Sequence, residues 1–135
     1  MIAHMSDYAI VNLLDLEDST QGRAPGLEGR FARKHLASRD LGISHWRYEP
    51  NTRSPMGHSH REQEEAYVVV AGSGRVRLGD DVREIRRWDV VRVAPAVVRA
   101  FESGPEGLDL IAVGGPRPEG GDGVLSESPW PDAMP

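Results

Sequence analysis

The chain has 135 residues, no cysteine and a formal net charge of −5. This length is typical of a single domain, and the lack of cysteine excludes disulfides, zinc–thiolate sites, iron–sulfur clusters and cysteine nucleophiles. The 16 basic residues form no block of the kind that binds nucleic acid. The apolar runs are far shorter than the roughly 20 residues of a membrane span, and the N-terminus lacks a signal-peptide pattern. We therefore expect a cytoplasmic protein with no membrane or nucleic-acid partner.

The 15 glycines and 10 prolines separate short runs of β-branched residues, and no stretch has a sustained 3.6-residue apolar period. This pattern predicts an all-β sandwich or barrel of short strands. Turns are expected at Gly72–Gly74 and at Gly79–Asp81, the second one closing a hairpin. In chain order, the expected elements are a strand or arm at Tyr8–Leu14 and strands at Phe31–Leu36, Ile43–Tyr48, His58–His60, Ala66–Ala71, Arg75–Leu78, Val82–Arg86, Val90–Val93, Arg99–Glu102 and Leu108–Val113.

We expect three regions along the chain. Residues 1–7 are predicted to be disordered or tag-like, residues 8–113 to form the barrel, and residues 114–135, which are rich in glycine and proline, to form an extended tail. Trp130 is the residue expected to pin this tail to the barrel or to a partner chain.

The segment from His58 to Gly72 contains the most informative pattern. His58 and His60 share one face of a strand, because residues i and i+2 point the same way. Glu65 follows a short polar turn, in which Glu62, Gln63 and Glu64 are expected to be solvated, and it begins the next strand. Two imidazoles and one carboxylate match a ligand set that suits Fe(II), and Mn, Ni or Zn also fit.

The spacing H-x-H, four residues, E, six residues, G resembles the first motif of the cupin family. His58, His60, Glu65 and Gly72 occupy its positions, and only the leading glycine is replaced, by Thr52. The resemblance covers roughly residues 43–113. It implies a double-stranded β-helix (jelly-roll) barrel with a metal on His58, His60 and Glu65, and it makes a homodimer the expected assembly.

The second cupin motif is altered between Trp88 and Arg99. Trp88 stands where the family has glycine, Ala94 replaces proline, Ala96 replaces the second glycine, and Arg99 replaces the third histidine ligand. Arginine cannot ligate a metal, because its guanidinium has five donors and no acceptor.

Two interpretations of Arg99 remain open. In the first, the metal stays on the other three ligands and Arg99 binds an anionic group of the substrate in bidentate fashion. In the second, the metal is lost, Arg99 pairs with Glu65 or Glu64, and the barrel binds an organic ligand or nothing. His45, on a nearby predicted strand, is a further candidate ligand, although a lone strand histidine is more often structural.

Two functional hypotheses follow. One is a binding protein for a small, anionic metabolite, with a divalent metal on His58, His60 and Glu65 as an optional component. The other is a metal-dependent enzyme of the dioxygenase, isomerase or lyase class, in which Arg99 orients the substrate. Tyr67 shares a strand face with Glu65 and is the second predicted substrate-binding residue; it is also the candidate acid. The sequence assigns no catalytic residue and no specific reaction.

Overall fold

The structure, a computed structural model, describes residues 7–127 and 130–132. Except for Asp7, the expected disordered or tag-like segment lies outside these ranges. No helix within them is long and apolar enough to cross a membrane. The elements in chain order are η1 (Leu13–Asp15), β1 (Leu27–Phe31), α1 (Arg33–Leu36), β2 (Gly42–Tyr48), β3 (Gly57–His60), β4 (Glu65–Leu78), β5 (Asp81–Arg86), β6 (Val90–Val93), β7 (Arg99–Gly114) and β8 (Gly123–Ser126).

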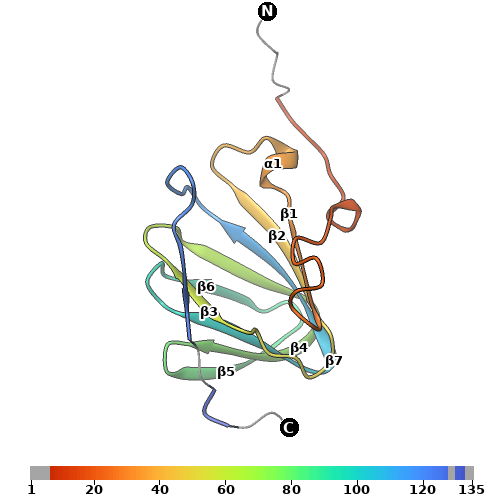
Figure 1. The fold of residues 1–135 in the computed structure, drawn as a ribbon, viewed down its shortest axis with the longest axis vertical. Helices are drawn as coiled ribbons and strands as arrows, with labels where there is room; N and C mark the ends of the chain where they lie inside the picture. Colours follow the sequence, from red (N-terminus) through yellow and green to blue (C-terminus); the bar gives the residue numbers. More distant parts are fainter. Residues whose placement is uncertain (1–6, 128–129, 133–135) are drawn as a thin grey trace, which may run out of the picture.

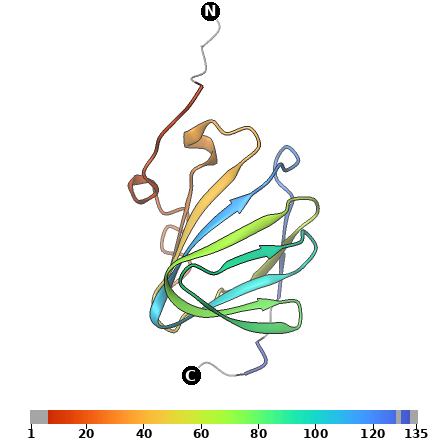
Figure 2. The same ribbon diagram turned by 180° about the vertical axis from the view of Figure 1, so that it is seen from behind.

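The strands form one antiparallel sheet that curls into a half-barrel (Figures 1 and 2). One path through the sheet has the order β1-β2-β7-β3-β8, and β4 pairs with β5, β6 and β7. The longest strand pairing in the sheet is that of β4 with β7, which runs from Glu65↔Gly114 to Leu78↔Arg99. The all-β prediction is therefore confirmed.

Two glycines allow β4 and β7 to bend together across the barrel. The predicted turn at Gly72–Gly74 is wrong: these residues lie inside β4, where the pairing with β7 shifts register. Gly72 has a φ of +73°, and a Cβ atom on Gly72 or Gly74 would lie 2.0 Å from a backbone oxygen of β7. Glycine is required here because the two backbones approach so closely. The predicted hairpin is confirmed, since Leu78 pairs with Asp81.

The predictions near the N-terminus and in β7 needed correction. The segment expected as a strand at Phe31–Leu36 is the end of β1 followed by α1, which ends at Ala37 in a left-handed conformation. The residues of α1 include no β-branched residue and no Phe, Tyr or Trp, so nothing after Phe31 favours continuing the strand. The two strands expected between Arg99 and Val113 are one continuous strand, β7.

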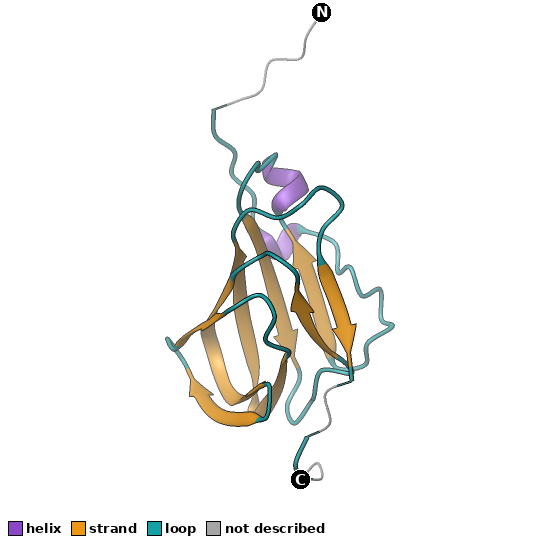
Figure 3. Ribbon diagram, turned by 90° about the vertical axis from the view of Figure 1, so that its left-hand side faces the viewer, coloured by secondary structure: helices purple, strands orange, loops and turns teal. Residues whose placement is uncertain are grey.

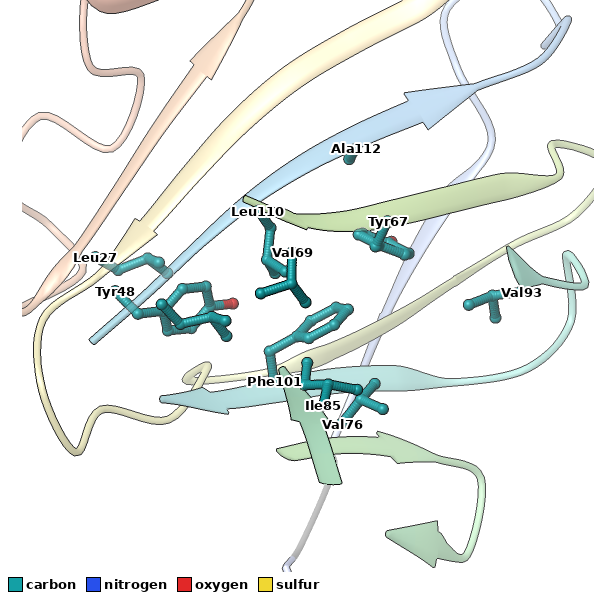
Figure 4. Packing of buried hydrophobic residues seen from close by; sticks show 11 residues of the cluster. Leu27, Tyr48, Tyr67, Val69, Val76, Ile85, Val93, Phe101, Leu110 and Ala112 are labelled. Carbon is teal, nitrogen blue, oxygen red and sulfur yellow. The ribbon is translucent and has the colours of Figure 1, made fainter. Parts of the chain in front are cut away.

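The core fills the space between the two sides of the curled sheet (Figure 4). Tyr67 of β4 and Phe101 of β7 pack with their ring centroids 4.8 Å apart. Val69 and Leu110 are almost fully buried next to them. Tyr67 is only 3% exposed, so one side of its ring belongs to the core while its hydroxyl reaches the candidate site described below.

The C-terminal segment is attached to the barrel at two places. Strand β8 pairs with β3, from Gly57↔Ser126 to His60↔Gly123, and Figure 3 shows the strands of the curled sheet in side view. Farther along, the ring centroid of Trp130 lies 5.0 Å from the guanidinium carbon of Arg53 and 5.4 Å from that of Arg75. Both arginines also bond Asp132. Trp130 thus packs against the barrel of its own chain, and a domain boundary at residue 113 stays a prediction.

Candidate metal centre

Three predicted ligands converge at one end of the barrel. His58 and His60 lie on β3, and Glu65 is the first residue of β4. Their nearest ligand atoms lie within 4.8 Å of one another. The Glu65 Oε1 atom is 3.0 Å from His60 Nε2 and 3.4 Å from His58 Nε2. The period-2 geometry of β3 therefore brings both imidazoles to the same carboxylate oxygen.

These distances fit a divalent cation. Metal–ligand bonds of about 2.0–2.2 Å place neighbouring donor atoms roughly 3–3.5 Å apart, which is the spacing between Glu65 Oε1 and the two Nε2 atoms. Two imidazole nitrogens and a carboxylate oxygen are also a donor set that Fe, Mn, Ni and Zn accept. The group of His58, His60 and Glu65 can therefore hold a metal ion.

Glu65 is held as a carboxylate. Burial would raise its pKa, but hydrogen bonds with His58 and Tyr67 and the charges of His60 and His58 outweigh burial and lower the pKa from 4.5 to about 2. The Tyr67 hydroxyl donates to Glu65 Oε1 at 2.6 Å. Burial and the Glu65 charge raise the pKa of Tyr67 well above 10. Tyr67 is thus a neutral hydrogen-bond donor inside the site.

Arg99 lies beside this group and is fully buried. It is opposite His58 in the pairing of β3 with β7, which places it where the third histidine ligand is expected from the second motif. Its Nη1 atom donates to the carbonyl oxygens of Val97 at 2.8 Å and of Pro95 at 3.2 Å. Its Nη2 atom lies 3.5 Å from Glu65 Oε1. Arg99 is therefore the ionic partner of Glu65, while Glu64 pairs with Arg92 at the surface.

The pocket above these residues has a volume of about 710 Å³. Besides His58, His60, Glu65 and Tyr67, it has an apolar wall and a basic rim. The apolar wall consists of Phe31, Ile43, Trp46, Ala112, Val124 and Leu125, and the rim includes Arg33, Lys34 and Arg117.

The indole of Trp46 is the largest apolar surface in the wall. It packs edge-on against Phe31, with the ring centroids 5.3 Å apart. Gly29 makes room for it, because a Cβ atom there would lie 2.5 Å from the indole. The pocket thus combines an apolar wall with positively charged side chains at its rim.

His45 is not part of the site. It alternates with the pocket residues Ser44 and Trp46 along β2 and so points to the opposite face of the sheet. Its Nε2 atom lies 3.2 Å from Asp109 Oδ1, which also accepts a hydrogen bond from Arg47. The structural interpretation of this histidine therefore describes it better than the ligand interpretation.

Asp122 is a site residue that the sequence analysis missed. It lies just before β8, in the segment expected to be a tail, and contacts His60 Nδ1 at 2.9 Å. Gln63, expected to be solvated, is only 5% exposed and donates its backbone N–H to Asp122. No spacing in the sequence indicates these contacts, because 62 positions separate Asp122 from His60.

Trp88 has a backbone conformation that favours glycine. Its φ is +75°, although tryptophan stands at the position where the second motif has glycine. A left-handed conformation costs a residue with a Cβ atom roughly 1–2 kcal/mol. The side chain is 64% exposed and lies beside the Arg87 guanidinium, so little burial of the indole offsets this cost.

This strain can be measured with two variants at the same position. Trp88→Gly and Trp88→Ala both remove the indole, but only glycine relieves the strained φ. We expect Trp88→Gly to be about 1 kcal/mol more stable than Trp88→Ala in urea unfolding. Equal midpoints for the two variants would show that the backbone at this position is not strained.

The structure resembles solved cupins. It matches a cupin protein from Bacteroides fragilis with a TM-score of 0.69 and 17% identity, over 85% of this chain and 89% of that one. It matches a protein with a double-stranded β-helix domain from Klebsiella pneumoniae with a TM-score of 0.70 and 18% identity, over 88% and 97% of the two chains. The chain has the cupin fold. The resemblance implied by the first motif is thereby confirmed at the level of the fold.

A larger cupin structure also matches. An oxalate decarboxylase from Lactobacillus farciminis, in complex with formate, has a TM-score of 0.70 and 18% identity over 85% of this chain and 34% of that one. No family model matches the sequence of this chain, and no curated protein matches it either. With identities below 20%, these structures establish the barrel but not its ligand.

Proposed function

We propose that this cupin binds a small organic anion in the pocket at the mouth of its barrel, with a divalent metal held by His58, His60 and Glu65. The observation that carries the proposal is the convergence of three metal-binding groups at the floor of a pocket with apolar walls and a basic rim. The ion would supply a Lewis-acidic centre with open coordination positions for a ligand oxygen.

Arg33 is the strongest candidate for binding the anionic group. Its Nη1 atom donates to the carbonyl oxygen of Arg39, while its Nη2 atom is buried and makes no hydrogen bond. Within the described part of the chain, no carboxylate lies at ion-pair distance from Arg33. Lys34 and Arg117 add positive charge to the same rim. Because Arg33 lines the pocket, a carboxylate ligand would form the ion pair that its guanidinium lacks.

Arg99, unlike Arg33, does not line the pocket. It has no exposed surface and lies behind Glu65, so direct contact with a ligand requires Glu65 to move. We propose that its main role is to keep Glu65 ionised and in place. The prediction that Arg99 itself binds the substrate stays a prediction, as does the same role for Tyr67.

The second candidate function is catalysis on the bound anion. The observation that favours it is the Tyr67 hydroxyl, which is 2.6 Å from Glu65 Oε1 and can hold a proton beside the pocket. In this case the chain would position the substrate with Arg33 and keep water away with Trp46 and Leu125. Turnover of a bound carboxylate, measured with the metal present and with the metal removed, separates this function from binding alone.

The test is a binding experiment on protein purified without a chelating column. We expect uptake of Fe, Mn, Ni or Zn by elemental analysis and calorimetric titration, and its loss in His58→Ala. In a thermal-shift screen with small carboxylates that carry an apolar group, Arg33→Gln should weaken binding about 10- to 100-fold, the cost of one charge-assisted hydrogen bond. Arg83→Gln, an exposed arginine outside the pocket, is the matched control.

Each outcome of this experiment has one meaning. Ligand stabilisation that disappears with EDTA supports the metal-dependent site. Stabilisation that is insensitive to EDTA supports a metal-free binding protein, the other interpretation of Arg99. Failure to take up any of the four metals contradicts the metal half of the proposal. An unchanged affinity of Arg33→Gln for the carboxylate contradicts the assignment of Arg33 as the residue that binds the anionic group.

We also propose that the protein is a homodimer that pairs through its N-terminal segment. Tyr8 and Ile10 are 81% and 91% exposed, and two such apolar side chains on one segment suit burial against a second chain. A molar mass of a single chain by light scattering would contradict this.

A further inference from the structure

The C-terminal segment contributes a carboxylate to the candidate metal centre. Strand β8 pairs with the strand that carries both histidines, and Gly123 is opposite His60 in this pairing. Asp122, the residue before it, therefore lies next to the His60 ring. Its side chain is only 2% exposed, although it belongs to a segment rich in glycine and proline.

Both carboxylate oxygens of Asp122 have partners. The Oδ2 atom accepts hydrogen bonds from the backbone N–H groups of Glu62 at 2.7 Å and of Gln63 at 2.8 Å. The Oδ1 atom lies 2.9 Å from His60 Nδ1. A carboxylate has no proton to give, so this last contact is a hydrogen bond only if Nδ1 carries the proton.

We propose that Asp122 is a positioning residue that holds a proton of His60 on Nδ1, so that Nε2 is the ring nitrogen left to bind a metal between His60 and Glu65. A histidine ligand commonly needs such a partner, which fixes both its tautomer and its ring orientation. The metal part of this inference rests on the proposed function. The control of the His60 tautomer by Asp122 does not depend on it.

Asp122 also stabilises the loop between β3 and β4, since it accepts from two loop N–H groups. A purely structural role must therefore be distinguished from positioning. Asp122→Asn makes this distinction, because an amide has one oxygen and one NH₂ group. The two backbone N–H groups require an acceptor, so the amide oxygen stays with the loop and the NH₂ group faces His60. Nδ1 must then accept and carries no proton.

The experiment combines a metal titration with NMR of the His60 ring. We expect Asp122→Asn to retain the fold, judged by circular dichroism, and to bind Zn²⁺ about 10- to 100-fold more weakly than the unchanged protein. In metal-free protein at mildly alkaline pH, ¹⁵N NMR should show a proton on His60 Nδ1 in the unchanged protein and none on Nδ1 in Asp122→Asn. Glu119→Gln removes an exposed carboxylate from the same segment and should change neither result.

The two measurements also separate this inference from the proposed function. If no variant binds Zn²⁺ but Nδ1 loses its proton as expected, the metal proposal fails and the role of Asp122 stands. If Nδ1 of His60 carries no proton in the unchanged protein, the inference is overturned even without a folded variant. It is likewise overturned if Asp122→Asn binds Zn²⁺ as tightly as Glu119→Gln.

Discussion

Replacing Glu65 with glutamine is expected to destabilise the metal-free protein by about 3 kcal/mol, the low end of the cost of removing one partner from a buried ion pair. Arg99 is fully buried, and Glu65 Oε1, 3.5 Å from its Nη2 atom, is its ionic partner. Without this carboxylate, the guanidinium would lose its anionic partner and keep the two carbonyl oxygens that Nη1 contacts, which carry no full charge. Urea unfolding measures the effect, and a fall in Tm of about 10 °C should accompany it.

Two further variants isolate the charge pair. Glu64→Gln removes an exposed glutamate whose partner is Arg92, and it should change stability by less than about 1 kcal/mol. The double variant Glu65→Gln with Arg99→Met removes both charges and should recover most of the lost stability, because a buried pair replaced by apolar side chains is often neutral. A double variant as unstable as Glu65→Gln would show that the charge of Arg99 is not the cause.

The stability difference between the unchanged protein and Glu65→Gln should depend on pH. The pKa of Glu65 is lowered from 4.5 to about 2 in the folded protein, so the folded state binds this proton more weakly than the unfolded state. The contribution of the carboxylate is complete above pH 4.5 and is lost as the pH falls toward 2. The difference between the two proteins should narrow over that window.

Replacing Arg99 with histidine is expected to raise the affinity for a divalent metal at least 100-fold. A doubly charged ion about 5 Å from a guanidinium is repelled by roughly 7 kcal/mol at an effective dielectric of about 20, although Glu65 offsets part of this. The substitution removes the positive charge and places an imidazole opposite His58, where the strand pairing positions residue 99. Calorimetric titration with Zn²⁺ and Mn²⁺ measures the change.

Arg99→Met separates the two causes of this increase. Methionine removes the charge but offers no strong ligand, so its affinity should lie between those of the unchanged protein and Arg99→His. If Arg99→His binds no more tightly than Arg99→Met, the imidazole at position 99 does not reach the metal. If neither variant binds more tightly than the unchanged protein, Arg99 does not limit metal binding.

The Oε1 atom of Glu65 explains why both substitutions have large effects. It faces His58 and His60, accepts a hydrogen bond from the Tyr67 hydroxyl, and lies near the Arg99 guanidinium. A metal ion and the guanidinium therefore share the same carboxylate oxygen. The balance between them would decide whether this site binds a metal tightly or keeps an ion pair in place of part of the ligand set.

The sequence was sufficient to predict the features that depend on local geometry. His58 and His60 share a face because strand residues alternate, and the Gly79–Asp81 segment predicts a hairpin because of its turn residues. The spacing from His58 to Gly72 also led to the correct fold. Each of these predictions involves residues fewer than 15 positions apart, whose relative placement a single strand or turn largely dictates.

The tertiary structure decided the contacts between distant segments. The position of Arg99 opposite His58 and behind Glu65 depends on the pairing of β3 with β7, and the contact of Asp122 with His60 depends on the pairing of β3 with β8. The sequence predicted a turn at Gly72, whereas this glycine is needed because β7 passes close to it. The contact is with Gly107, about 35 positions away, so no local pattern could indicate it. Sequence periodicity describes which way a side chain points from its own strand, whereas the partner that it meets is set by how the strands pair.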